Sequence, residues 1–176
     1  VSMLPVTYGY LLMLGAEGLK HVTEMAILNA NYLASSFEKL GFKILFKGKQ
    51  GRVGHEMIWD CSAFNKEYGI SELDIAKRLM DFGFHAPTLS FPVHGTLMVE
   101  PTESEPKEEL DRFIEALKTI REEMCEVAEG KADKTDNVLK NAPHTHKVLT
   151  ADEWTHTYPR SKAAYPLPWV AENKFW

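Results

Sequence analysis

The stretch FGFHAPTLSFPVHGTLMVEPTESEP, residues 82–106, decides how this chain is organised. It contains four of the nine prolines and two of the seven histidines, and Thr96–Val99 is its only clearly strand-like run. Proline fixes φ and favours an extended conformation in the residue before it. We therefore predict that most of the stretch is rigid, irregular backbone close to a functional site, with a helix holding each end.

On both sides of this stretch the sequence predicts helices and short strands. Apolar residues recur every three or four positions in the helical segments and every second position in the strands, and glycine follows the helix ends. In chain order the predicted elements are helices Val6–Leu14 and Gly18–Leu40, strands Phe42–Phe46 and His55–Asp60, a helix from Ser71 to Gly83, strand Thr96–Glu100 and a helix from Ser104 to Gly130. This order predicts an α+β fold whose small, mainly antiparallel sheet is covered by helices on one face.

Polar residues predict helix starts and solvent-facing sides. Ser71 with Asp74, and Thr150 with Glu153, have the spacing of a capping box. In the helix that ends at Gly83, the predicted apolar side consists of Leu73, Ile75, Ala76, Leu79 and Met80, and the side predicted to face water consists of Asp74, Lys77, Arg78 and Asp81. Residues 61–69 are polar and predict a connection without regular structure.

We expect three parts. Residues 1–41 are helices that link to a domain outside this chain, residues 42–130 are a small α+β domain, and residues 131–176 are an irregular C-terminal strap. The strap holds four prolines, three histidines and six large aromatic residues, too many aromatics for a disordered tail and too many prolines for a separate layer. The apolar start of the chain suggests a piece of a longer protein, so we also expect the chain to self-associate.

Composition excludes several classes of function. The formal charge of −5 without a cluster of basic residues argues against nucleic-acid binding. The two cysteines are not closely spaced, so neither a disulfide framework nor a zinc site is predicted, and a reducing compartment is expected. The longest apolar run is far shorter than the roughly 20 residues that a membrane span needs. His144 and His146 have no evident third ligand for a metal, and no metal site is predicted.

Five side chains could take part in binding or chemistry. His85 and Thr88 follow the end of a predicted helix and can each donate or accept a hydrogen bond. Glu100 ends a strand directly before a proline, a position from which a carboxylate can point into a cleft. Arg52 and His55 flank Gly54 in the predicted hairpin, where an arginine could bind a carboxylate with two hydrogen bonds.

Several of these segments together resemble one protein family. They are GAEGLK at residues 15–20, RVGHE at 52–56, GFHAPT at 83–88, TLMVEPTESE at 96–105 and AAYPLPWV at 163–170. In this order they resemble the C-terminal region of glycine dehydrogenase (decarboxylating), the P-protein of the glycine cleavage system. The resemblance covers nearly the whole chain, and TLMVEPTESE is its most specific part.

The resemblance implies the small C-terminal domain of an aspartate-aminotransferase-like (fold type I) enzyme. Such an enzyme uses pyridoxal phosphate to decarboxylate glycine and passes the aminomethyl group to the lipoyl arm of the H-protein. The family's cofactor lysine lies upstream of the matched region, so no residue here is assigned to the cofactor and the isolated chain is expected to be inactive. The implied partners are the large cofactor domain and the H-protein, in the bacterial cytoplasm or, in a eukaryote, the mitochondrial matrix.

The resemblance also implies roles for the candidate residues. His85, Thr88, Glu100 and Thr102 would line the catalytic cleft as the small domain closes, and Arg52 is the arginine expected to hold the substrate carboxylate. Two alternatives stay open. The chain could be a non-catalytic binding module derived from such a domain, or part of another fold-type-I enzyme of the glutamate-decarboxylase or cysteine-desulfurase type. TLMVEPTESE argues against the latter.

Overall fold

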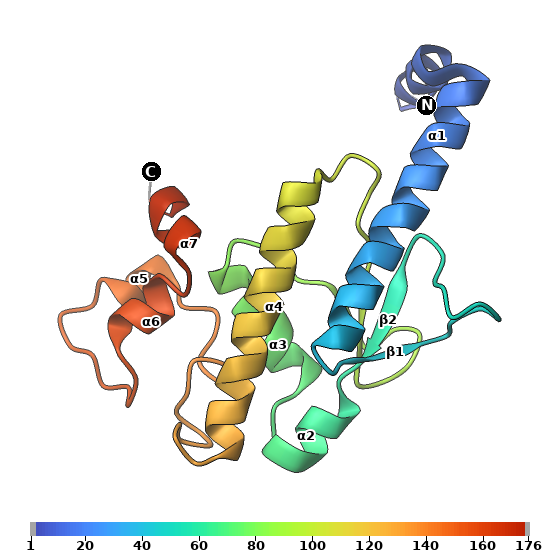
Figure 1. Cartoon of the computed structure of the whole chain (residues 1–176). Helices are drawn as coiled ribbons and strands as arrows, with labels where there is room; N and C mark the ends of the chain where they lie inside the picture. Colours follow the sequence, from blue (N-terminus) through green and yellow to red (C-terminus); the bar gives the residue numbers. More distant parts are fainter. Residues whose placement is uncertain (1–2, 175–176) are drawn as a thin grey trace.

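A four-stranded antiparallel sheet forms the base of the fold. The computed structural model describes residues 3–174 (Figure 1). The strands are β1 (Lys43–Leu45), β2 (Met57–Asp60), β3 (Thr88–Leu89) and β4 (Thr96–Val99), in the spatial order β1-β2-β4-β3. Every neighbouring pair is antiparallel. The α+β class and the antiparallel sheet are confirmed, and β3 is an edge strand of two residues that was not predicted.

Seven helices complete the described part of the chain. They are α1 (Leu4–Lys39), α2 (Ser62–Tyr68), α3 (Glu72–Asp81), α4 (Lys107–Ala128), α5 (His146–Leu149), α6 (Arg160–Ala164) and α7 (Pro168–Asn173). The prediction of an irregular connection over 61–69 was wrong because α2 has a single buried residue, Phe64, and therefore no apolar period. The predicted helix start at Ser104 was also wrong: α4 begins at Lys107 after Pro106, which makes no side-chain cap hydrogen bond.

The core lies where α1 and α4, which run side by side in Figure 1, meet the sheet. The strand register places Trp59 between Ile44 and Leu97, so the three side chains share one sheet face. All three belong to the main buried cluster, together with Phe37 of α1 and Leu117 of α4. The apolar sides of the two long helices therefore pack against the sheet and against each other.

α3 buries Ile75, Ala76 and Leu79 of its predicted apolar side, together with polar residues that were predicted to face water. The Ser71–Asp74 capping box is present in full, as predicted. However, Asp74, Arg78 and Asp81 are buried, whereas Leu73 and Met80 are 43% and 48% exposed. The prediction of a solvated polar side was wrong because acidic, basic and carbonyl partners from distant parts of the chain satisfy these groups inside the protein.

The first helical turns form an apolar arm, residues 4–14, that contains no charged residue. The predicted break at Gly15 is confirmed, since its φ of 60° and ψ of −171° are not helical. Met13 is 88% exposed, and Val6, Tyr8 and Leu12 are each more than 60% exposed. A helix that is apolar on all sides is normally buried on all sides. The arm therefore needs a covering surface that residues 3–174 do not supply.

We expect the isolated chain to self-associate through the apolar arm, because an exposed apolar patch of this kind favours association. Replacing Leu12 and Met13 together with lysine should shift the chain towards monomer. Light scattering with sedimentation velocity measures the change, and Thr23→Lys, on the exposed polar surface of α1, is the matched control. A wild-type chain that is already a monodisperse monomer would contradict the expectation.

The C-terminal segment, residues 131–174, is ordered around short helices and polar contacts. The predicted capping box at Thr150 is absent; Thr145 instead caps α5, accepting a hydrogen bond from Val148 N. Asp136 accepts hydrogen bonds from Asn141 Nδ2 and Thr157 N, each at 2.7 Å. The predicted strap also included Phe175 and Trp176, which lie outside the described residues. No helix within residues 3–174 is both long and apolar enough to cross a membrane.

Asp136 should make the C-terminal segment sensitive to acid. Burial alone would raise the pKa of its carboxyl, but hydrogen bonds from His156, Thr157 and Asn141 outweigh that effect and lower it from 3.8 to about 2. A folded pKa below the unfolded one means that this stabilisation is complete above pH 3.8 and is lost as pH falls towards 2.

Asp136→Asn should therefore weaken the pH dependence of stability between pH 4 and 2. Amide hydrogen exchange of residues 136–157 at each pH measures it. Asp152→Asn, at an exposed position, is the control and should keep the wild-type slope. Identical slopes for Asp136→Asn and the wild type would contradict the assignment.

Candidate functional site

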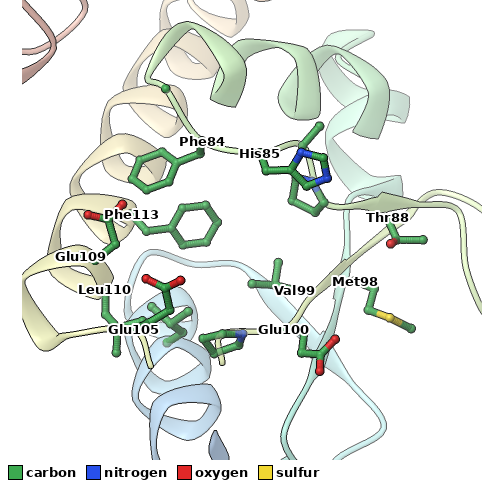
Figure 2. A pocket seen from close by; sticks show the side chains of 15 residues that line it. Phe84, His85, Thr88, Met98, Val99, Glu100, Glu105, Glu109, Leu110 and Phe113 are labelled. Atoms are coloured by element: carbon green, nitrogen blue, oxygen red, sulfur yellow. The ribbon is translucent and has the colours of Figure 1, made fainter. Parts of the chain in front are cut away.

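An open cleft of about 450 Å³ lies between the end of α3, the end of β4 and the start of α4. Figure 2 shows its two edges: Phe84 and His85 on one side, and Glu100 and Glu105 on the other. Leu33 of α1 together with Val99, Leu110 and Phe113 supply apolar side chains to its lining. Two parts of the organising stretch, FHAPT and the start of EPTES, therefore meet across one cavity.

Local backbone features place each edge. Gly83, with φ of 84°, allows the chain to leave α3, and Phe84 N then donates to Leu79 O at 3.1 Å. Thr88 pairs with Met98 across β3 and β4, which sets the spacing between the two edges. Phe84 contacts the ring of Phe113, with ring centroids 5.0 Å apart. Packing on α4 thus fixes the wall beside His85.

His85, Thr88 and Glu100 all line this cleft and are exposed. Within residues 3–174 the imidazole of His85 makes no hydrogen bond or ion pair. The Glu100 carboxylate lies 3.9 Å from His55 Nε2 in the segment before β2. Free imidazole and hydroxyl groups on an apolar-lined cleft can bind and orient a polar ligand or exchange a proton with it.

The charged side chains that line the cleft are acidic. Glu100, Glu105 and Glu109 contribute carboxylates, and the lining contains no lysine or arginine. Within residues 3–174, Glu109 is the one of these three that pairs with an arginine or lysine, Arg112, one turn further along α4. A phosphate needs cations or converging backbone N–H groups. The lining of this cleft therefore does not fit the phosphate of pyridoxal phosphate, and no step is assigned to that cofactor within this chain.

Asn29 is a positioning residue that sequence reasoning missed. It is 5% exposed on α1, and its Nδ2 donates to Thr102 O at 2.9 Å and to Glu105 O at 3.4 Å. These bonds hold the turn that carries Glu100 and Glu105 into place. Its only sequence signal is an amide group on the otherwise apolar face of a long helix, where a buried amide must find partners.

The remaining candidates lie outside the cleft lining. The Thr102 side chain is exposed and shares a 2.8 Å hydrogen bond with Ser104 Oγ. Arg52 is exposed on the loop between β1 and β2, and His55 touches the cleft only through Glu100. The predicted contact of Arg52 with a substrate carboxylate stays a prediction.

The His144 ring and the Cys61 thiol are both buried inside the protein. Both ring nitrogens of His144 are occupied, Nδ1 by Asp81 Oδ2 and Nε2 by Tyr158 Oη, each at 2.7 Å. No group of three or more metal-ligating side chains with suitable geometry occurs within residues 3–174. Burial raises the pKa of the Cys61 thiol and keeps it protonated.

The chain is similar to known proteins of one family. The family model described as "Glycine dehydrogenase, C-terminal domain" matches residues 22–144. A glycine dehydrogenase (decarboxylating) of Bacteroides fragilis is 59% identical over 175 residues, which is 99% of this chain and 18% of that protein. The proteins of the same description from Flavobacterium johnsoniae and Nostoc punctiforme are 61% and 55% identical, over 97% and 99% of this chain and 18% of their own lengths. The chain thus spans 18% of the length of these curated relatives.

Proposed function

Because this chain belongs to the glycine dehydrogenase C-terminal domain family, we propose that it is the small domain that closes over the catalytic site of a glycine dehydrogenase (decarboxylating). The observation that carries the proposal is the cleft of Figure 2, where FHAPT and the start of EPTES, both within the matched residues 22–144, face each other. In this proposal the chain supplies one wall of the catalytic cavity. The remainder of the protein supplies the other wall.

The parent enzyme would decarboxylate glycine with pyridoxal phosphate and pass the aminomethyl group to the lipoyl arm of a carrier protein. The cofactor supplies the electron sink for the loss of CO2 when it is bound. The carboxylate-rich lining described above agrees with a cofactor phosphate held entirely by the rest of the protein. Partnership with that remainder and with a lipoyl carrier is part of the same proposal.

The residues of this chain would act by orienting ligands and by excluding water. His85 and Thr88 would direct hydrogen bonds into the closed cavity from one edge, and Glu100 would face them from the other. The apolar lining from Leu33, Val99 and Phe113 would displace water as the domain closes and so strengthen these polar interactions. Asn29 would hold the Glu100 edge in the geometry that closure requires.

Substitution at the His85 edge in the full-length enzyme tests the proposal. We expect His85→Ala and Thr88→Ala each to lower glycine–bicarbonate exchange by about tenfold or more, the effect of losing a directed polar contact to a reacting ligand. Their thermal stability should stay close to wild type because both side chains are exposed. Exchange of labelled bicarbonate into glycine measures activity, and a thermal melt measures stability.

His94→Ala is the matched control, since His94 is an exposed histidine of the same stretch that does not line the cleft. It should leave exchange unchanged. Wild-type activity of both cleft variants at equal folded concentration would reduce FHAPT to a structural turn. The non-catalytic binding module would then become the better description of the domain.

A further inference from the structure

The loop between β1 and β2 carries positive charge that the cleft does not use. From β1 through most of this loop, residues 43–55 hold four cations, Lys43, Lys47, Lys49 and Arg52, and no aspartate or glutamate, and Glu56 follows directly. Two of these cations are neutralised: Lys43 pairs with Asp60 at 3.0 Å and Lys47 pairs with Glu38 at 2.5 Å. Lys49 and Arg52 are exposed and make no ion pair within residues 3–174.

Arg52 lacks the charged or aromatic partners that the other four arginines have. Arg78 is buried among carboxylates, and Arg112 pairs with Glu109. Arg121 and Arg160 lie over aromatic rings, at 5.4 Å and 5.3 Å from the ring centroids. Among the five, Arg52 alone has a guanidinium without a hydrogen bond, ion pair or ring contact to the described residues, so it can bind an external anion with its full set of donors.

The loop is held rigidly despite its three glycines. Gly48 N donates to Arg52 O at 2.8 Å, and Gly51 N donates to Gly48 O at 2.9 Å, which closes a tight turn around Lys49. Asn31 of α1 anchors the end of the loop by donating to Val53 O at 2.9 Å and accepting from Val53 N at 3.1 Å. The two unpaired cations are therefore presented in a preorganised loop, which lowers the entropic cost of binding.

Phe46 adds an apolar contact at the base of this loop. Its side chain is 67% exposed, and its φ of 55° lies in the left-handed region that a bulky residue rarely adopts. Such strained residues cluster at functional surfaces. Phe46 and the unpaired Arg52 belong to the same short loop, and phenylalanine and arginine are both enriched in protein interfaces.

We propose that residues 46–52, with Phe46, Lys49 and Arg52 as contact residues, are a docking surface for an acidic protein surface with an apolar recess. Tight nucleic-acid binding depends on many phosphate contacts, whereas the loop offers two free cations on a chain of charge −5. One aromatic anchor with two flanking cations suits a protein partner, in which a few central residues carry most of the affinity. The inference does not depend on the proposed enzymatic function.

A binding experiment with the 176-residue chain tests this. The probe is a fluorescein-labelled peptide in which glutamates flank a central pair of leucines, and fluorescence anisotropy measures the dissociation constant at low and at physiological salt. We expect Lys49→Glu with Arg52→Glu to weaken binding by about tenfold or more, and Phe46→Ala to weaken it several-fold. Binding by the wild type should weaken as salt rises.

Lys118→Glu with Lys134→Glu is the control, because it changes the net charge equally at exposed sites elsewhere. Its affinity should match the wild type, and a thermal melt checks that every variant is folded. Equal weakening by the control pair, or equal affinity of the wild type and the loop variant, would overturn the proposal. Tighter binding of a single-stranded oligonucleotide of matched charge would overturn it as well, in favour of a nucleic-acid surface.

Discussion

Arg78→Ala is expected to lower the free energy of unfolding by about 3–5 kcal/mol, the usual effect of removing one partner from a buried ion pair. Arg78 has no exposed surface, and its guanidinium donates to both carboxylate oxygens of Glu123, at 3.0 Å and 2.6 Å. It also donates to Asp81 Oδ2 at 2.9 Å and to Lys162 O at 3.1 Å. Without Arg78, two buried carboxylates would lose their cation.

The same network ties the C-terminal segment to the body of the domain. Asp81 accepts hydrogen bonds from His144 N and lies 2.7 Å from His144 Nδ1. Burial alone would raise the pKa of Asp81, but hydrogen bonding to His144 and the charge of Arg78 lower it below its ordinary value. Loss of Arg78 should therefore loosen residues 144–162 before the sheet unfolds.

Urea unfolding followed by circular dichroism measures the Arg78 effect, and hydrogen exchange of residues 144–162 measures the local one. Arg112→Ala is the matched control, since Arg112 pairs with Glu109 at the surface and its loss should cost less than about 1 kcal/mol. Arg78→Lys keeps the positive charge but loses the paired N–H donors of the guanidinium, so its loss of unfolding free energy should lie between those of Arg78→Ala and Arg112→Ala. This variant preserves the test if Arg78→Ala does not fold. A cost for Arg78→Ala no larger than the control would refute the network's role.

Trp59→Ala is expected to cost about 3–5 kcal/mol because it empties the centre of the core. Trp59 is fully buried on β2, with its ring centroid 5.5 Å from that of Phe37 and 4.5 Å from that of Phe42. These contacts join α1 and the residue directly before β1 to the middle of the sheet. The cavity would therefore open between the two layers of the fold.

Trp59→Phe should cost much less than the alanine variant. Among the fully buried side-chain nitrogen and oxygen atoms of residues 3–174, Trp59 Nε1 is the one without a hydrogen-bond partner. Burying such a donor costs about 1–3 kcal/mol, which phenylalanine removes while it keeps most of the apolar contact. Urea unfolding of both variants measures the difference.

Trp154→Phe provides the comparison, because Trp154 Nε1 donates to Tyr158 O at 2.6 Å and its removal leaves a carbonyl unpaired. Trp154→Phe should therefore gain no stability from the removal of its N–H group. If Trp59→Phe destabilises the protein as much as Trp59→Ala does, removing the unpaired N–H group does not offset the loss of the indole, and the expectation is wrong.

The sequence by itself determined the main helices, three of the four strands and the family. The periods of α1 and α4 and the box formed by Ser71 and Asp74 are local signals, because each depends on residues within a few turns of one another. The break at Gly15 is local for the same reason, since a residue without Cβ reaches a positive φ at little cost. The family followed from specific segments such as TLMVEPTESE, which do not depend on knowing the fold.

Only the tertiary structure decided which polar residues are buried and which candidates share a cavity. The partners of the α3 side chains are remote: Glu123 lies 45 residues beyond Arg78, and His144 lies 63 residues beyond Asp81. Likewise, Asn29 reaches a turn that lies 73 residues away. A periodic pattern records the polarity of a side chain but not the identity of a distant partner, and burial of a charge depends on that partner. For this reason the sequence was enough to predict α3. Long-range packing decided which of its polar side chains are buried and which residues form the cleft beside it.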